Sequence, residues 1–230
     1  MRRPVNYGRS MKARIYQAML KSIAFLLALG LAGCAQKSGD LTTPPPGKKL
    51  IFEDNFERKE IGDNWLDTWG RYKIVDGELR AHGAKNKPLW LKKKLPRDTR
   101  VEFTARSESP AIDIKVELFG DGKSFAKKAS YTATSYVVIL GGWNNSRSII
   151  ARMNEHGKDR VVRESPKGVQ GKTYHFILVR RQSKLTWYLK PGLFLEMRDT
   201  IPLEGTGHEY FAINNWASEV YFDNFKVFEL

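Results

Sequence analysis

The stretch Ala111-Ile-Asp-Ile-Lys-Val-Glu-Leu118 decides the fold, because apolar and polar side chains alternate along it without a break. Its apolar positions are Ile112, Ile114, Val116 and Leu118, and the charged positions between them are Asp113, Lys115 and Glu117. Successive side chains of a β-strand point to opposite faces of the sheet. The stretch therefore predicts a strand with one face on a core and the other toward solvent or a ligand.

Short segments of the same kind lie on both sides of this stretch. Thr99–Arg106 alternates in the same way, and further strands are expected at Lys49–Glu53, Arg71–Val75, Leu79–Ala81, Pro88–Lys92, Ser135–Leu140, Ser148–Met153, Arg160–Arg163, Tyr174–Arg181, Lys184–Leu189, Leu195–Asp199, Tyr210–Asn214 and Glu219–Phe228. Gly-rich turns separate many of them, and Gln182-Ser183 is expected to join two strands as a hairpin. This pattern predicts an all-β jelly-roll sandwich of two antiparallel sheets. Its expected core tryptophans are Trp65, Trp69, Trp90 and Trp187.

Motifs at both ends of this region carry a family resemblance. Phe52-Glu53-Asp54-Asn55-Phe56 precedes Gly62, Trp65 and Asp76-Gly77-Glu78-Leu79, and Val220-Tyr-Phe-Asp-Asn-Phe-Lys-Val227 stands at the end. The layout resembles concanavalin A-like lectin/glucanase domains, including laminin-G-like and family-16-glucanase-like ones. The resemblance implies that the first and last strands lie close together. Such folds host sugar binders and hydrolases alike, so function must be argued from a site.

Residues 1–33 are typical of a secretory signal. Six basic residues and no acidic one precede or border the apolar stretch Ile23–Leu31. That stretch is too short for a membrane-spanning helix, which needs about 20 apolar residues. Met11 would begin a more typical signal than Met1, so the sequence leaves open which of the two codons is the start.

Leu31-Ala32-Gly33-Cys34 resembles the lipobox of bacterial lipoproteins. The resemblance implies cleavage before Cys34 and acyl chains such as palmitate anchoring Cys34 to a membrane. Ala35 stands where an aspartate would resemble an inner-membrane retention signal, so we expect a cell-envelope location, at the outer membrane where the cell has one. An ordinary signal with a chance cysteine is the alternative. Cys34 is the chain's only cysteine, which excludes an internal disulfide.

Residues 34–48 are expected to form a flexible linker, stiffened by Pro44-Pro45-Pro46. Residues 49–230 are expected to form one domain. Lys and Arg total 39 against 25 acidic residues, and removing the six basic residues of the signal leaves 33 against 25, or +8. This charge favours anionic lipids or acidic polysaccharides, although a lysine-biased solvated surface accounts for it equally. An exported chain without helix-turn-helix or zinc-finger spacing is not expected to bind nucleic acid.

A hydrolase similar to family 16 would carry a Glu-x-Asp-x-Glu pattern on one strand face. Here Ala111 and Lys115 flank Asp113 at the glutamate positions. Asp113 and Glu117 would lie about 13 Å apart on a regular strand, whereas hydrolytic carboxyls lie about 5 to 9.5 Å apart. We therefore expect a non-catalytic domain. A hydrolase or lyase would need a second carboxylate from another strand, such as Glu102 or Glu155, and ion pairing on a solvated face is the other interpretation.

Two clusters of tryptophan and asparagine are candidates for carbohydrate contact: Trp143-Asn144-Asn145 and Asn214-Asn215-Trp216. An indole ring stacks on the apolar face of a pyranose, and amides bind hydroxyls as donors and acceptors. Both clusters could instead be simple turns, since asparagine tolerates left-handed backbone.

Charged residues follow the first cluster. Arg147, Arg152, Glu155 and His156 could bind an acidic or polar sugar, with arginine forking to a carboxylate, or could form a charged hairpin. No cofactor motif is present. By resemblance, Asp54 and Asp223 are candidates for a structural calcium site, although each could simply cap a turn.

The sequence thus favours a lipid-anchored polysaccharide-binding domain. A glycoside hydrolase with carboxylates from different strands is the first alternative. A structural envelope lipoprotein that binds a protein partner is the second.

Overall fold

The structure is a computed structural model that describes residues 42–128 and 131–230. The expected signal segment 1–33 and the expected lipidation site Cys34 lie outside the described residues. Within them, no helix is both long enough and apolar enough to cross a membrane.

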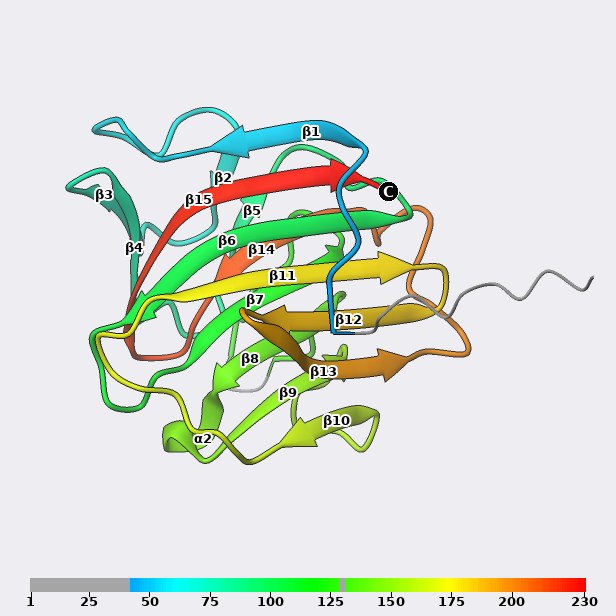
Figure 1. Ribbon diagram of the computed structural model, residues 1–230. Helices are drawn as coiled ribbons and strands as arrows, with labels where there is room; N and C mark the ends of the chain where they lie inside the picture. Colours follow the sequence, from blue (N-terminus) through cyan, green and yellow to red (C-terminus); the bar gives the residue numbers. More distant parts are fainter. Residues whose placement is uncertain (1–41, 129–130) are drawn as a thin grey trace, which may run out of the picture. The chain divides into compact units, whose positions relative to one another are not determined.

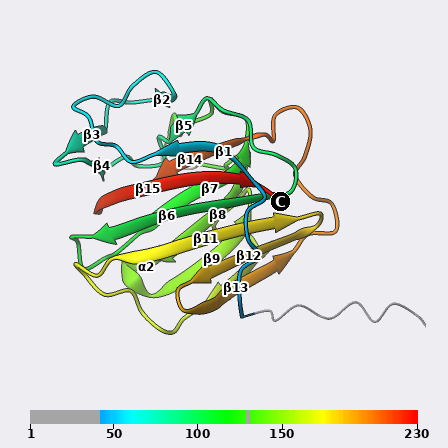
Figure 2. The same ribbon diagram turned by 45° about the horizontal axis from the view of Figure 1, so that its top comes forward.

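Two antiparallel sheets pack face to face, as expected for a β-sandwich (Figures 1 and 2). Sheet A has the order β13 (Gly192–Arg198), β12 (Lys184–Leu189), β11 (Tyr174–Arg181), β6 (Thr99–Ser107), β15 (Glu219–Glu229), β4 (Glu78–His82) and β3 (Tyr72–Val75), with β1 (Lys49–Asp54) also paired to β15. Sheet B has the order β10 (Arg160–Arg163), β9 (Arg147–Arg152), β8 (Tyr136–Gly141), β7 (Ile114–Gly120), β14 (Tyr210–Asn214), β5 (Leu89–Leu91) and β2 (Trp65–Asp67).

The first and last strands pair, as the family resemblance implied. β1 aligns Asp54 with Phe225 and Lys49 with Glu229 of β15. The other edge of β15 pairs with β6, so the C-terminal strand lies inside sheet A. The expected hairpin at Gln182-Ser183 is also confirmed, since β11 and β12 pair up to Arg181 and Lys184.

The core lies between the two sheets and is rich in stacked aromatic rings. Phe103 stacks on Phe176 with 4.7 Å between ring centroids, and Phe176 stacks on Trp187 at 5.4 Å. Trp65, Trp90 and Trp187 are buried as expected. Trp69 is not a core residue: it is 52% exposed, and the Lys87 ammonium lies 3.4 Å from its ring centroid.

The strand expected at Ala111–Leu118 is shifted and differs from the prediction on its charged face. Ile112 and Asp113 have φ of 59° and 53°, so they form a left-handed bend and β7 begins at Ile114. Lys115 and Glu117 are only 1% and 0% exposed. The interpretation of this face as a solvated one is therefore wrong, because loops cover the outer face of β7.

The residues before β1 lie against the outer face of sheet A (Figure 1). The Arg100 guanidinium of β6 donates a hydrogen bond to the Pro45 carbonyl, and the Lys48 amide donates to Glu229 O at 2.9 Å. Pro44 and Pro45 are half-buried. The described end of the predicted linker thus lies on sheet A, whereas the cavity described next opens over sheet B.

Candidate functional site

One cavity of about 670 Å³ opens over the outer face of sheet B. Its lining includes Trp143, Asn144, His156 and Trp216 together with Asp113. Its volume lies within the usual range for small-molecule sites, about 300 to 1,000 Å³. The structure therefore brings both sequence-predicted tryptophan clusters to one hollow, although 73 positions separate the two tryptophans.

A left-handed turn positions Trp143 in the wall of this cavity. In the single turn α2 (Gly142–Asn145), residues Trp143, Asn144 and Asn145 have φ of 51°, 56° and 58°. This backbone costs roughly 1 to 2 kcal/mol per L-residue. The Asn145 side chain holds the turn by donating to Gly168 O at 2.8 Å and accepting from Gly168 N at 2.9 Å. Strained backbone of this kind is concentrated at functional sites.

The Trp143 ring is surrounded by polar side chains. His156 packs edge-on against it at 5.5 Å between centroids. The guanidinium carbons of Arg147 and Arg160 lie 5.7 and 5.5 Å from the ring centroid, within the range of cation–π contacts. Arg147 thus supports Trp143 and does not itself line the cavity.

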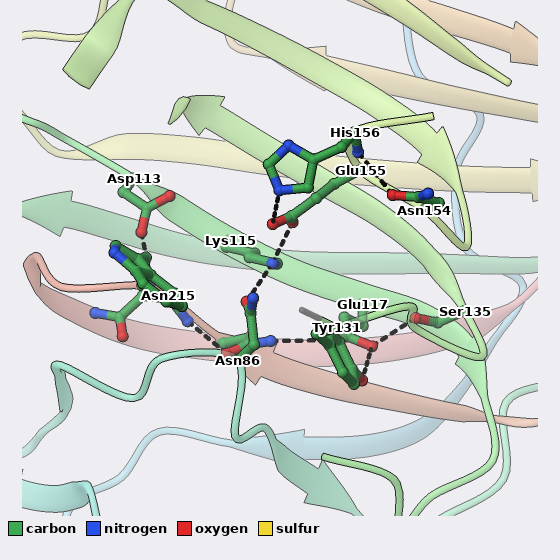
Figure 3. Close-up of polar contacts among 12 residues, drawn as sticks. Asn86, Asp113, Lys115, Glu117, Tyr131, Ser135, Asn154, Glu155, His156 and Asn215 are labelled. Atoms are coloured by element: carbon green, nitrogen blue, oxygen red, sulfur yellow. Dashed lines mark hydrogen bonds and ion pairs between the residues drawn. The ribbon is translucent and has the colours of Figure 1, made fainter. Parts of the chain in front are cut away.

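A buried ion pair forms the floor below (Figure 3). The Lys115 ammonium, from β7, binds the Glu155 carboxylate and also donates to Asn86 Oδ1 at 2.6 Å. Glu155 Oε1 lies 3.5 Å from His156 Nε2. Since the Lys115 side chain is only 2% exposed, its positive charge is balanced by Glu155 inside the protein.

Asp113 connects the floor to the second tryptophan. Its Oδ2 accepts a hydrogen bond from the Trp216 backbone N–H at 2.5 Å. Burial raises the pKa of the Asp113 carboxyl to about 6, although Lys115 and the Trp216 N–H act in the opposite direction. A carboxyl that changes protonation near neutral pH on a cavity wall is a typical property of a functional site.

Glu117 lies deeper and does not line the cavity. It accepts hydrogen bonds from Ser135 Oγ at 2.5 Å, Asn214 Nδ2 at 2.7 Å and Tyr131 Oη at 3.3 Å (Figure 3). Burial also raises the pKa of Glu117. Since Glu117 is fully buried and saturated with donors, it holds loops together and is not placed to reach a ligand.

Three of the predicted asparagines are engaged inside the protein and do not line the cavity. Asn145 binds Gly168, as described above. Asn214 donates to Glu117. Asn215 accepts from Ala84 N at 2.9 Å and donates to Ser218 O. Asn214 and Asn215 are 0% exposed, so Asn144 alone among the four predicted asparagines lies on the cavity wall.

One of the arginines predicted for the site does not line the cavity. Arg152 stands at the far end of β9 from Arg147, where it donates to Asp199 Oδ2 at 3.0 Å and to Ile201 O at 3.3 Å. The predicted fork from Arg152 to a sugar carboxylate has no geometric basis in this cavity.

Asn86 and Tyr131 are among the lining residues that sequence reasoning missed. Asn86 follows β4. Its backbone N–H donates to the Asn215 backbone carbonyl at 3.1 Å, which holds the loop beside the cavity. Tyr131 reaches Glu117 from the connection between β7 and β8. Neither residue stands in a motif, so no signal in the sequence could have found them.

The two carboxylates proposed as partners of Asp113 lie in different parts of the structure. Glu102 lies on β6 of sheet A, bound to Arg100 at 2.6 Å and 3.4 Å from His175. Glu155 lines the cavity with Asp113. Only Glu155 is therefore placed to act together with Asp113.

The carboxylates expected for calcium already have partners in the chain. Asp54 accepts from Arg58 at 2.5 and 2.8 Å and from Trp65 Nε1 at 2.8 Å. Burial tends to raise the pKa of Asp54, but these bonds outweigh it and hold the pKa below its usual value. Asp223 accepts from Asn224. Within residues 42–128 and 131–230, no group of three or more His, Cys, Asp or Glu is arranged to hold a metal ion, so the calcium hypothesis gains no support.

Solved structures share the fold at low sequence identity. The carbohydrate-binding module CBM66 from Bacillus subtilis superposes with a TM-score of 0.54 at 14% identity, covering 72% of this chain and 96% of the module. SCLam, a non-specific endo-β-1,3(4)-glucanase of family GH16, gives 0.56 at 10% identity, covering 82% and 94%. A laminarinase from Flavobacterium sp. UMI-01 gives 0.54 at 12% identity, covering 79% and 100%.

These comparisons show the fold alone, because all three identities are low. The domain is a concanavalin A-like jelly roll, as the sequence motifs predicted. No protein-family model and no curated protein matches the sequence.

Proposed function

We propose that this domain binds a glycan without cleaving it. The observation that carries the proposal is that Trp143 and Trp216 line one cavity, together with hydrogen-bonding groups of Asp113, Asn144 and His156. Trp216 is 46% exposed, which is unusual for so large an apolar ring and leaves it available for stacking. Aromatic rings beside a few polar groups suit the alternating apolar faces and hydroxyls of a saccharide.

The structural neighbours support this choice of ligand. One is a carbohydrate-binding module, and two are enzymes named for acting on glucans. At such low identity they do not determine what this chain binds, so the cavity itself is the main support.

The absence of catalysis is inferred from the groups around Asp113. Ala111 and Lys115 stand where a family-16-like enzyme would have glutamates. Lys115 also binds Glu155 in a buried ion pair, so that carboxylate already has a partner within the protein.

We further propose that the chain is a lipoprotein of the cell envelope, anchored through Cys34 and sorted to the outer membrane where one exists. The support is the sequence of residues 1–34. The described residues just before β1 lie against sheet A and leave the cavity over sheet B uncovered.

The test is a glycan array followed by calorimetry on the purified protein, with Trp216→Ala as the key variant. We expect this variant to lose at least about tenfold in affinity, or about 1.4 kcal/mol, because the stacking platform is removed. Trp69→Ala is the matched control, since Trp69 is similarly exposed but does not line the cavity. Absence of binding to any glycan, or equal binding by both variants, would contradict the proposal.

A second candidate function is glycoside hydrolysis or lyase chemistry. It is favoured by one observation: Asp113, with a pKa raised by burial to about 6, shares the cavity with Glu155. A protonated carboxyl near neutral pH could act as a general acid. Release of reducing ends from a bound polysaccharide, abolished by Asp113→Asn, would favour this function over simple binding.

A further inference from the structure

We propose that the cavity selects glycans that carry free amino groups, and that Asp113 and Glu155 face the cationic nitrogen. The inference rests on the proposed glycan binding and names the chemical class of the ligand. It differs from what the overall charge of the chain suggests, since a basic chain favours anionic polymers.

A ligand in the cavity would meet acidic side chains on the wall. Asp113 and Glu155 line the cavity, and no lysine or arginine of the described residues does so. An acidic sugar would therefore bring its carboxylate toward two others. Like charges placed together with little access to water are strongly disfavoured.

The nearby cations do not compensate for these carboxylates on the ligand side. The Lys115 ammonium is bound by Glu155 and Asn86 and is shut off from solvent. Arg147 and Arg160 lie against the Trp143 ring and not on the cavity wall. Lys115, Arg147 and Arg160 therefore hold the walls of the site, and His156 is the one basic side chain among the described residues that line the cavity.

The floor holds more carboxylates than ammonium groups. Asp113, Glu117 and Glu155 lie near the single ammonium of Lys115. Burial raises the pKa of Asp113 and of Glu117, and the negative charge of Glu155 adds to both shifts. A ligand amine beside Asp113 would offset this excess negative charge. A neutral sugar would leave it in place.

The geometry separates the roles of the two tryptophans. Trp143 already has two guanidinium groups near its ring, so it suits the apolar face of a sugar better than a second cation. Trp216 is joined to Asp113 through its backbone, and no cation–π partner within the described residues contacts its ring. An ammonium group is attracted both by a carboxylate and by an indole face. The amine is therefore expected at the Asp113–Trp216 side of the cavity.

The test compares a cationic, a neutral and an anionic oligosaccharide. Calorimetry at a pH just above 6 would measure affinity for oligoglucosamine, for its N-acetylated counterpart and for oligogalacturonate. We expect oligoglucosamine to bind at least about tenfold more tightly than the N-acetylated form, and oligogalacturonate to bind least.

The variant that isolates the effect is Asp113→Asn, which keeps an oxygen for the Trp216 N–H and removes the charge. It should reduce the preference for oligoglucosamine over the N-acetylated form about tenfold or more. Asp63→Asn on an exposed loop is the control. Equal affinity for both forms, or tighter binding of oligogalacturonate, would overturn the inference and leave glycan binding intact. If none of the three ligands and no array glycan binds, the proposed function itself fails.

Discussion

Lys115 and Glu155 are 40 positions apart in the chain, yet the ammonium of one binds the carboxylate of the other below the candidate site. The two side chains are only 2% and 12% exposed. The pair joins β7 to the loop between β9 and β10, whose residues Glu155 and His156 line the cavity. Several properties of the domain depend on it.

Breaking this ion pair should destabilise the domain. Glu155→Ala leaves the Lys115 charge buried with Asn86 alone, and we expect a loss of about 3 kcal/mol or more in the free energy of unfolding. Urea denaturation followed by tryptophan fluorescence measures it. The double variant Lys115→Met/Glu155→Ala should recover part of the loss, because the buried ammonium that had lost its carboxylate partner is removed as well. Glu209→Gln, which breaks the exposed Lys94–Glu209 pair, should leave the midpoint unchanged. Equal effects of Glu155→Ala and Glu209→Gln would show that the buried pair is not structural.

The Asp113 carboxyl should make the domain less stable as pH rises from about 4 to about 6. Its pKa in the folded protein is about 6, above the ordinary value of 3.8, so the folded state binds the proton more tightly than the unfolded state. Stability is therefore lost as pH rises through this window, by about 3 kcal/mol for this one group. Lys115 and Glu155, whose charges act on the Asp113 carboxyl, are present in both proteins to be compared.

The comparison is between the parent protein and Asp113→Asn. We expect the variant to be more stable than the parent at pH 7 and equal to it near pH 4, measured by denaturation at each pH. A constant difference across the range would mean that Asp113 ionises as freely as in water. A gain in stability with a loss of binding would show that the carboxylate is kept for function at a cost in stability.

Gly120 should tolerate no side chain. A Cβ atom there would lie 2.4 Å from Trp90 Cη2 and 3.1 Å from Ser135 Cβ, and Trp90 is fully buried. We expect Gly120→Ala to cost about 1 to 3 kcal/mol through overpacking, measured by urea denaturation. Gly192→Ala is a suitable control, since a Cβ there meets nothing within 4 Å. If both substitutions had the same small effect, the close packing of Trp90 on β7 would be disproved.

Cys34 should carry the membrane anchor. We expect the parent protein to incorporate labelled palmitate in bacterial cells and to sediment with membranes, whereas Cys34→Ala should remain as an unlabelled precursor. Density-gradient separation would then show whether the labelled protein is in the outer membrane. A parent protein that is released unlabelled would contradict the lipoprotein proposal and leave the fold unaffected.

Much of the fold could be predicted because it depends on local patterns. Alternation in 111–118 identifies its buried face, and Gln182-Ser183 marks the hairpin between β11 and β12. β2 was missed, because the three residues Trp65–Asp67 are too few to show a period. Trp69 was assigned to the core on its size, although only its neighbours determine whether a ring is covered.

The site could be predicted only in part, since a cluster in the sequence does not say which side chains face outward. The tryptophans of both clusters reach the cavity, whereas Asn145, Asn214 and Asn215 hold the backbone that carries them. Arg152 stands near Arg147 in sequence but at the other end of its strand. Asn86 and Tyr131 arrive from loops with no distinguishing residues.

The sequence by itself determined the class of the fold, because the period of its apolar residues shows strands. Its end motifs implied, by family resemblance, that the first and last strands lie together, and residues 1–34 gave the expectation of export and lipidation. Only the tertiary structure decided that Lys115 is buried with Glu155, that the polar face of β7 is covered, and that Trp143 and Trp216 share one cavity. These facts depend on loops brought together from distant parts of the chain. The burial of these side chains determines which charges face the cavity. A pattern along the sequence cannot predict such burial, because the residues that cause it lie far apart in the chain.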